Sequence, residues 1–498
     1  MNWQKRLFRC GLVIAALVIP ALSPATNQKD DQLVALGHAR HHRFGVNVNQ
    51  FENLNNLPFS EHVGTIRLWD LAGYGVAWGA IQFHGQGSFD WSVLDQYAQY
   101  ALANDVDIIY PVSATPHWAS SFQGTSDKCK YDFGHLTGAC YAPADWNYFT
   151  TFLTALVSRY NSSATAGNPQ TGCTSTHPKC NGVIKFYEIW NEPGVPTEWD
   201  PNQTYNQMNS MQLFVKLNEL AITTIRGLDT NAKILFGAVY QPQFMTDFWA
   251  TYNGPKNFDY VAYHSYPIGP TNRYYGAPEN TQDLVSQLTA VMIQNGVHLP
   301  IMNTEGSYLF TLQQLTDAEI SYYAVRYALL HFAMNAHKFV WYQWDKATGL
   351  FDSTTQTLTH AGDGYVSAEN WLAGSWLNPV GSGCLDSSGI LHNILDPSCA
   401  MRDFRGRKAD WGRTFVVNMH RPDKTAAQAV WYVYTVYSPD CNTTSSHCYV
   451  DWSRTTPYQV PSQYNASTDT SGNTKCVANG QITAMAEPVL LSHSSLCK

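Results

Sequence analysis

The sequence predicts a (β/α)8 TIM barrel followed by a small C-terminal β-sandwich-like domain. Short apolar runs recur along the chain, amphipathic stretches separate them, and short β-type runs replace both patterns near residue 381. Several apolar runs are continuous, which is typical of parallel strands covered by helices. An open doubly wound sheet is the structural alternative. The predicted barrel strands are Phe44–Val48, Gly64–Trp69, Val106–Val112, Val183–Trp190, Ala232–Ala238, Phe258–Tyr263, Leu299–Asn303 and Lys338–Trp344.

The stretches between the apolar runs carry helical periodicity. In one of them, Trp91, Leu94, Tyr97, Ala98 and Ala101 fall on a single helical face. Strands that alternate with helices in this way fit a closed barrel. No Gly-rich phosphate loop follows the first strand, which weakens a nucleotide-binding version of the open sheet. The expected helices are Trp91–Asn104, Trp146–Tyr160, Tyr205–Leu228, Thr281–Gln294 and Asp317–Asn335.

The chain divides into four segments on these patterns. We expect residues 1–25 to be a signal peptide and residues 43–380 to form the barrel. The segment 26–42 is a candidate extra strand of the β-rich accessory domain, which we expect over residues 381–498. The β-type runs that define this last domain include Thr414–Asn418, Ala429–Tyr437 and Pro488–Leu491.

The first residues resemble an export signal. Lys5, Arg6 and Arg9 are followed by the apolar stretch Gly11–Leu22 and by small residues at Ser23–Ala25. The apolar stretch is short for a membrane span, which needs about 20 residues. An uncleaved N-terminal anchor is the alternative. The sequence therefore predicts a secreted or periplasmic protein with no stable membrane insertion after cleavage.

Cysteine usage agrees with export. Apart from Cys10, the ten remaining cysteines fall into close pairs that bracket polar stretches. Local disulfides in an oxidising compartment are the natural interpretation. A metal site is the alternative, but no Cys-x-x-Cys spacing occurs. The expected pairs are Cys129/Cys140, Cys173/Cys180, Cys384/Cys399, Cys441/Cys448 and Cys476/Cys497.

Charge excludes one class of partner. Only 14% of the 498 residues are charged, the formal net charge is −8, and no long basic run occurs. The electrostatic footprint of a nucleic-acid-binding protein is therefore absent. The histidines His38, His41 and His42 lie in a polar segment with no acidic partner pattern, so we expect no metal and no cofactor.

The sharpest local motif ends the fourth apolar run, over Phe186–Pro193. In a strand, alternate residues face the same way, so Glu188, Trp190 and Glu192 would share a side. At about 3.3 Å per residue, Glu188 lies roughly 13 Å below Glu192, within the packed interior of the barrel. Glu192 is therefore the candidate for chemistry and Glu188 for a buried polar network, because catalytic groups of this fold come from the C-terminal strand ends.

A second carboxylate, Glu305, follows the seventh apolar run directly. Strands four and seven lie across a closed eight-stranded barrel, so Glu192 and Glu305 can project into one pocket. Glycoside cleavage needs such a pair: one carboxylic acid protonates the departing oxygen and the other attacks or stabilises the sugar centre. An isolated glutamate would more often anchor a surface loop, but two at predicted catalytic strand ends favour chemistry.

The segment Ile-Trp-Asn-Glu-Pro at 189–193 resembles the acid/base motif of clan A glycoside hydrolases, especially glycoside hydrolase family 39. The resemblance covers about Phe44 to Trp376. It implies a retaining double displacement, with Glu192 as acid/base, preceded by Asn191, and Glu305 in Asn-Thr-Glu-Gly as the nucleophile.

The resemblance also implies substrate-binding positions. An arginine at the second strand, Arg67, would favour the ionised nucleophile by charge proximity, although pairing with Glu188 is the alternative. Trp118 is as well explained by loop packing, and His264 by a satisfied buried position. At the eighth strand Trp344 is preferred over Trp341 as the floor of the −1 subsite. The implied substrate-binding residues are Arg67, His117, Trp118, Asn191, His264, Tyr266 and Trp344.

Two positions depart from the family pattern and leave the sugar open. Family 39 members commonly have asparagine after Asn-Glu-Pro, where this chain has Gly194, and many relatives have tryptophan after the nucleophile, where it has Gly306. We therefore expect a secreted retaining O-glycoside hydrolase acting on a poly- or oligosaccharide. A non-catalytic carbohydrate-binding protein on a barrel scaffold and a transglycosidase are the alternatives.

Overall fold

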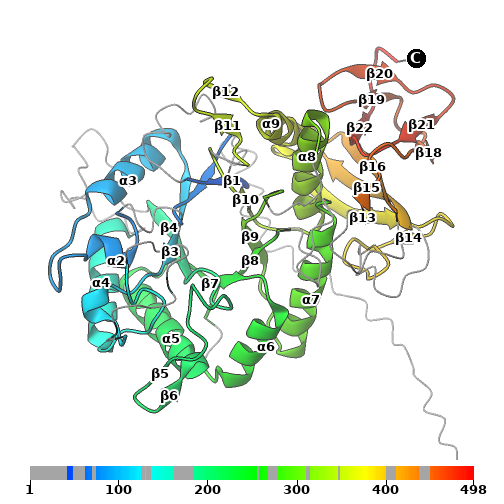
Figure 1. Cartoon of the computed structure of the whole chain (residues 1–498). Helices are drawn as coiled ribbons and strands as arrows, with labels where there is room; N and C mark the ends of the chain where they lie inside the picture. The colour runs from blue at the N-terminus through cyan, green and yellow to red at the C-terminus, as the bar shows by residue number, and fades with distance from the viewer. Residues whose placement is uncertain are drawn as a thin grey trace, which may run out of the picture.

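The chain folds into a barrel with a β-rich region packed against one side (Figure 1). The computed structural model describes residues 42–48, 62–69, 75–122, 124, 129, 136–161, 183–254, 257–266, 277–309, 315–345, 348–399, 411–436 and 449–497. The predicted signal peptide and most of the segment 26–42 lie outside these ranges.

The barrel is closed and all its strand pairs are parallel. Each of the eight predicted apolar runs overlaps one of its strands, so the closed barrel is confirmed and the open sheet is not. In spatial order the strands are β1 (Phe44–Asn47), β10 (Phe339–Trp341), β9 (Ile301–Glu305), β8 (Tyr260–His264), β7 (Lys233–Val239), β4 (Ile184–Ile189), β3 (Asp107–Val112) and β2 (Thr65–Arg67).

Helices surround the barrel, and polar caps define where several of them begin. A capping box formed by Asn209 and Gln212 starts α5 (Ser210–Leu228), and a second one starts α8 (Asp317–Ala333). The predicted helix from residue 205 is too long, because 204–209 form a short hairpin. The other helices are α2 (Trp78–Ile81), α3 (Ser92–Asn104), α4 (Trp146–Tyr160), α6 (Pro242–Thr251), α7 (Asn280–Gln294) and α9 (His360–Leu372).

The interior of the barrel has an apolar middle layer with polar side chains below and above it. Below it, Lys338 forms a buried ion pair with Asp107 and donates to Thr65 Oγ1. Side chains from six strands form a closed apolar cluster: Ile109, Phe186, Leu235, Ala262, Met302 and Val340. Glu188 lies two residues further along β4 than Phe186, and Arg67 lies at the end of β2. Both side chains are also fully buried. The apolar cluster fills the barrel, as is usual in this fold, so Glu188 and Arg67 are accessible only from the C-terminal face.

The C-terminal region is an antiparallel sheet with a second, smaller layer on top. Its central strands are β13 (Trp376–Leu385), β15 (Trp411–His420), β16 (Ala426–Val436) and β22 (Val489–Ser492). A two-stranded antiparallel sheet of β18 (Thr456–Gln459) and β21 (Gln481–Ala484) packs on one face through an apolar cluster that includes Val430, Val460 and Leu491. This arrangement confirms the predicted sandwich-like domain.

The opposite face of that sheet packs on the barrel helices. Phe415 and Trp431 stack at 5.2 Å and belong to the same apolar core as the barrel. The Trp431 indole donates a hydrogen bond of 2.8 Å to Glu279, which forms a fully buried ion pair with Arg326 of α8. The Arg326 guanidinium in turn lies 4.5 Å from the ring centroid of Trp452. Figure 1 shows the sheet beside α8 and α9.

Three of the five predicted disulfides lie within the described residues, and all three are formed. They join Cys129 to Cys140, Cys384 to Cys399 and Cys476 to Cys497. The pairs Cys173/Cys180 and Cys441/Cys448 fall outside the described residues. Disulfides of this kind are typical of proteins that work in an oxidising environment.

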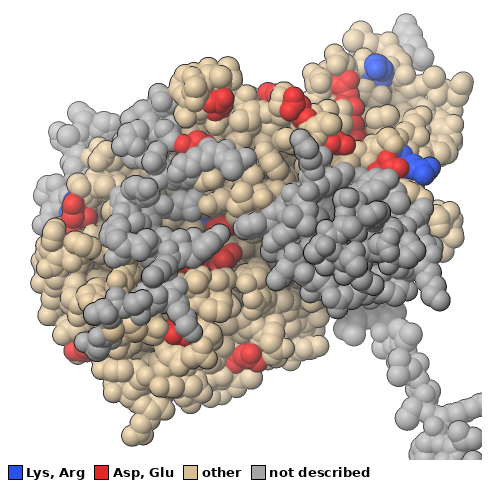
Figure 2. Space-filling view, in the orientation of Figure 1, with Lys and Arg blue, Asp and Glu red and all other residues tan. Residues whose placement is uncertain are grey.

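Among the described residues, no helix combines the length and the apolar character that crossing a membrane requires. On the face shown in Figure 2, acidic side chains (red) are spread over the described surface and basic ones (blue) are few. This distribution agrees with the formal net charge of −8.

Candidate active site

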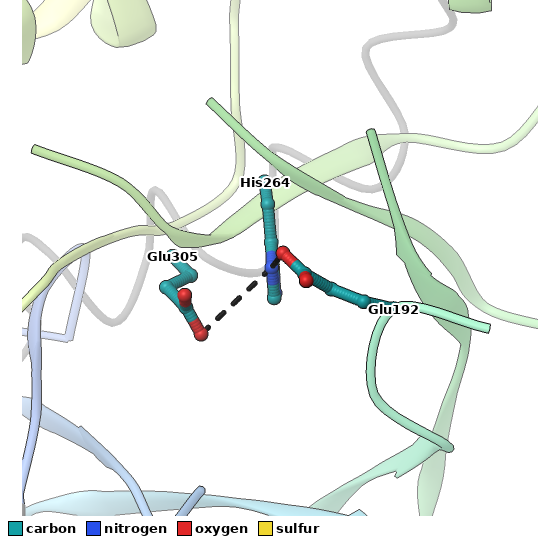
Figure 3. A group of neighbouring side chains, drawn as sticks. All are labelled: Glu192, His264 and Glu305. Atoms are coloured by element: carbon teal, nitrogen blue, oxygen red, sulfur yellow. Dashed lines mark hydrogen bonds and ion pairs between the residues drawn. The ribbon is translucent and has the colours of Figure 1, made fainter. Parts of the chain in front are cut away.

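Glu192 and Glu305 approach each other at the C-terminal end of the barrel. One ligand oxygen of each carboxylate and one ring nitrogen of His264 all lie within 4.8 Å of one another. Figure 3 shows the two carboxylates converging beside the imidazole ring. The Glu192 side chain is 20% exposed and that of Glu305 is 8% exposed, so both can be reached only from the open end of the barrel.

The backbone after β4 is what brings Glu192 to this position. Trp190 has a φ of 70° and Glu192 a φ of 35°, both in the left-handed region that non-glycine residues rarely adopt. The expected strand alternation therefore ends at Ile189. Trp190 does not share a side with Glu188; its indole packs on Trp199 at 5.0 Å and donates to the Glu198 carbonyl oxygen. Unusual φ values of this kind often occur at functional sites.

A register shift presents Glu305. Along the pairing of β8 and β9, Ala262 lies opposite Met302, yet His264 lies opposite Glu305, so β9 has one extra residue at this point. Simple alternation from the inward-facing Met302 would have turned Thr304 towards the barrel axis. Because an extra residue re-aims the side chains that follow it, Glu305 takes that place.

Arg67 holds both buried carboxylates. Its Nε and Nη2 atoms donate to Glu188 Oε2 at 2.8 and 2.6 Å, and its Nη1 atom donates to Glu305 Oε2 at 2.8 Å. The same guanidinium donates to Asn47 Oδ1 at 3.1 Å and to Asn191 Oδ1 at 2.6 Å. The contact with Glu188 and the proximity to Glu305 that the sequence suggested are thus both present, since the planar fork of Arg67 reaches both carboxylates.

Tyr266 and His264 form hydrogen bonds with different carboxylates. The Tyr266 hydroxyl donates to Glu305 Oε1 at 2.5 Å, so both oxygens of Glu305 accept hydrogen bonds. His264 Nδ1 lies 2.6 Å from Glu192 Oε1. Burial lowers the pKa of His264 to about 4, although the charge of Glu305 opposes that shift. The imidazole is therefore neutral at neutral pH, despite its contact with a glutamate.

The other predicted residues occupy three different environments. Asn191 is buried, and its Oδ1 faces Arg67, which leaves the amide nitrogen as a donor. Trp118 is half-buried; its indole donates to the Gln82 carbonyl oxygen at 2.7 Å and its ring packs on Tyr148 at 5.1 Å. Loop packing therefore accounts for Trp118. His117 is exposed in the same loop.

The strand-eight aromatic residue needs a correction. Trp344 is 1% exposed and stacks on Phe351 at 5.2 Å, and Trp341 is fully buried with its indole donating to the Thr348 carbonyl oxygen. The half-buried aromatic beside the site is Tyr342, whose ring centroid lies 6.0 Å from that of Tyr266. The alternation of side chains along a strand could not show which aromatic residue of Trp341–Trp344 faces the pocket.

Two residues of the candidate site, Asn47 and Tyr342, were not predicted from the sequence. Asn47 accepts from Arg67 and donates to the Thr304 carbonyl oxygen at 3.3 Å, which ties the first strand to the residue before Glu305. Its place at the end of the first apolar run was a usable signal.

The ligand atoms of Glu192, His264 and Glu305 also lie close enough to hold a metal ion.

The fold and this geometry define a class: a (β/α)8 barrel with two facing glutamates at the ends of opposite strands. No protein-family model and no curated protein matches the sequence. Solved structures do match its fold. A family 39 glycoside hydrolase from Bacteroides cellulosilyticus has 13% identity and a TM-score of 0.56, over 91% of this chain and 81% of that one.

Two further structures are similar over most of both chains. A glucosidase from Croceicoccus marinus is 9% identical with a TM-score of 0.52, covering 92% of this chain and 97% of that chain. A family 30 endoxylanase from Clostridium papyrosolvens is 13% identical with a TM-score of 0.50, covering 91% and 97%. The chain therefore has the fold of these glycoside hydrolases, and the predicted resemblance to family 39 is confirmed at the level of the fold.

Proposed function

We propose that this protein is a secreted retaining O-glycoside hydrolase, with Glu192 as the acid/base and Glu305 as the nucleophile. The observation that carries the proposal is the approach of the two carboxylates to within 4.8 Å. Retaining enzymes have carboxyl groups about 5–5.5 Å apart, whereas inverting enzymes need about 6.5–9.5 Å to admit a water molecule. The short separation leaves no such room.

The surroundings of the two carboxylates support different protonation states. Glu305 accepts from a guanidinium and a hydroxyl, which favours its ionised form as a nucleophile. Glu192 faces a neutral imidazole instead. A neutral histidine can accept from the protonated acid or, as the other tautomer, donate to the carboxylate, so His264 can serve Glu192 in both states.

The reaction follows from these roles. Glu192 gives its proton to the glycosidic oxygen while Glu305 attacks the anomeric carbon, so the glycosidic bond breaks and a glycosyl ester forms. Glu192, now ionised, then takes a proton from water, and the resulting attack on the anomeric carbon releases Glu305. Two inversions restore the original anomeric configuration.

Other residues complete a sugar site in this proposal. The Asn191 amide nitrogen is oriented away from Arg67 and can donate to a sugar hydroxyl. Tyr342 replaces Trp344 as the aromatic floor of the −1 subsite, because it is the half-buried ring next to Tyr266. His117 remains a candidate contact for a more distant sugar unit.

A panel of aryl glycosides and glycans tests the proposal. We expect wild-type turnover of at least one substrate, with NMR showing the retained anomer released first. Glu305→Gln should abolish turnover, and Glu192→Gln should be rescued by azide on a substrate with an activated leaving group. Glu219→Gln, an exposed glutamate on α5, controls for the substitution itself. Release of the inverted anomer would refute the assignment of roles.

The same panel separates the alternatives. A binding protein would retain sugars without turnover in wild type and variants alike. A transglycosidase would give longer products when a sugar acceptor is added, since the same glycosyl ester can be attacked by a sugar hydroxyl. The named activities of the similar structures include an endoxylanase, a glucosidase and a family 51 arabinofuranosidase, so xylans, glucosides and arabinofuranosides belong in the panel.

Secretion is supported by the predicted signal peptide and by the three disulfides. Sequencing the N-terminus of protein recovered from the medium or periplasm should place cleavage near residue 25. Recovery of the intact N-terminus in a membrane fraction would support the anchored alternative.

A further inference from the structure

Two neighbouring residues, Ser265 and Asn303, donate hydrogen bonds to the main chain of Glu305. Its carbonyl oxygen accepts from the backbone N–H of Ser265 and from Asn303 Nδ2, each at 2.8 Å. Asn303 also donates to Ser265 Oγ at 2.9 Å, and both residues are fully buried. The position of Glu305 is therefore linked to the side chain of Ser265.

Helix α8 supplies two more members of this cluster. The Tyr327 hydroxyl lies 2.7 Å from Ser265 Oγ and 3.1 Å from Asn303 Oδ1. His331 Nε2, one helical turn later, lies 3.1 Å from Ser265 Oγ. Tyr327 and His331 are both fully buried, so no solvent competes for these contacts.

Donor and acceptor rules fix the direction of these bonds. Burial lowers the pKa of His331 to about 4, so the ring is neutral and carries one proton. A carbonyl oxygen only accepts, so that proton is on Nδ1, which lies 2.7 Å from the Tyr327 carbonyl oxygen. His331 Nε2 then accepts from the Ser265 hydroxyl. The Ser265 proton is thereby committed and Asn303 Oδ1 only accepts, so the single Tyr327 proton is shared between Ser265 Oγ and Asn303 Oδ1.

The residue after Glu305 fits the same cluster. A Cβ atom at Gly306 would overlap the Tyr327 hydroxyl oxygen and lie 2.5 Å from the Ser265 carbonyl oxygen. Only glycine fits while these two groups stay in place. This packing explains why Gly306 stands where many relatives have tryptophan. The Tyr327 hydroxyl and the Ser265 carbonyl oxygen occupy the space that a side chain at residue 306 would need.

We propose that Tyr327 and His331, acting through Ser265 and Asn303, are positioning residues that fix the nucleophile Glu305 for attack. This inference rests on the proposed function, because the position of Glu305 affects the reaction rate only if Glu305 is the nucleophile. A misplacement of reacting groups by 1 Å can cost about 100-fold in rate. The cluster contacts the Glu305 main chain and all four of its members are fully buried, so its loss should lower kcat more than it changes KM.

Tyr327→Phe, Ser265→Ala and their double variant test the proposal on the best substrate of the panel. Tyr327→Phe keeps the ring and removes the hydroxyl that contacts Ser265 and Asn303; Ser265→Ala removes the hydroxyl that contacts Tyr327, His331 and Asn303. The matched control is Tyr365→Phe, a buried tyrosine of α9 that donates to the Gly45 carbonyl oxygen at 3.3 Å. For each variant, kcat, KM and the melting temperature are measured in the full chain.

We expect each single variant to lower kcat by about 10- to 100-fold, with KM within about threefold of wild type. The double variant should be little worse than the worse single one, because both changes break the same chain. Tyr365→Phe should lower only the melting temperature. The inference is overturned if Tyr327→Phe has wild-type kcat in an active enzyme, or if the two effects multiply.

The result distinguishes this inference from the proposed function. A wild type that turns over nothing, while binding sugars, refutes the hydrolase and removes the basis of the inference. An active wild type with fully active variants refutes the inference alone. If Ser265→Ala does not fold, Tyr327→Phe and His331→Gln form the pair, since His331→Gln breaks the chain at its other end.

Discussion

Replacing Arg67 with methionine is the most direct perturbation of the polar layer beneath the site. The guanidinium donates five hydrogen bonds, to Glu188 (two), Glu305, Asn47 and Asn191. It is the cation that contacts both buried carboxylates, Glu188 and Glu305. Arg67→Met therefore removes a positive charge that these two carboxylates share.

The size of the effect follows from these contacts. Breaking a buried ion pair from one side costs about 3–5 kcal/mol of folding stability. A hydrogen bond to a charged group contributes about 1.5–3 kcal/mol, so its loss at Glu305 should lower kcat/KM by about 10- to 150-fold. Removing a nearby opposite charge also makes a carboxylate harder to ionise, so the acidic limb of the kcat/KM profile should move up by about 1–3 pH units.

The assay is a profile of kcat/KM against pH, combined with urea denaturation at neutral pH. Arg67→Lys keeps the charge without the fork and should shift the acidic limb less than Arg67→Met. Arg159→Met is the control, because that arginine makes a two-point contact with Asp95 on the outside of the barrel. An acidic limb that does not move in Arg67→Met, with kcat/KM within threefold of wild type, would refute the reasoning.

Four further outcomes are expected. Gly306→Ala should reduce kcat by more than tenfold, whereas Gly194→Ala, whose Cβ would meet no atom closer than 3.3 Å, should change it little; equal effects would contradict the packing argument. Trp431→Phe should lower the free energy of unfolding by about 1–3 kcal/mol, because it removes a donor to the buried Glu279; urea denaturation measures this, and unchanged stability would count against it. Burial lowers the pKa of His331 from 6.5 to about 4, so the unfolded chain binds more protons than the folded one between these values. Stability from this group should fall by about 3 kcal/mol as the pH drops from 7 to 4, and His331→Gln should flatten that dependence in the same denaturation series. Extended treatment with a chelator should leave turnover unchanged if hydrolysis relies on the two carboxylates; loss of activity that an added divalent ion restores would instead indicate a metal at the candidate ligands.

Periodicity was enough to predict the architecture. Several barrel strands are buried on both sides and so appear as continuous apolar runs, and the covering helices carry an apolar stripe at the helical period. The cysteine pairs could also be predicted, because close spacing makes a local disulfide geometrically easy. The helices α2, α6 and α9 were not predicted. The first is only four residues long, too short for a period to show.

The details of the site depend on departures from regular structure. Alternation along β4 predicted that Trp190 would share a side with Glu188, but a positive φ at Trp190 turns its ring outward. The extra residue in β9 that presents Glu305 leaves no pattern in the sequence. Tyr342 lies between two tryptophans, and its position depends on where regular pairing stops. Such local changes are decided by tertiary contacts, which a sequence period cannot represent.

Helix α8 joins the C-terminal sheet to the catalytic end of the barrel. Arg326 points towards the sheet, where Trp452 covers its guanidinium and Trp431 shares its partner Glu279. The next residue, Tyr327, points the other way and contacts Ser265 behind Glu305. Because adjacent residues on a helix cannot shift independently, packing at the sheet also fixes the helix behind the proposed nucleophile Glu305. The sheet, with the buried Arg326–Glu279 ion pair at its junction with α8, is therefore part of the structural support of the candidate active site.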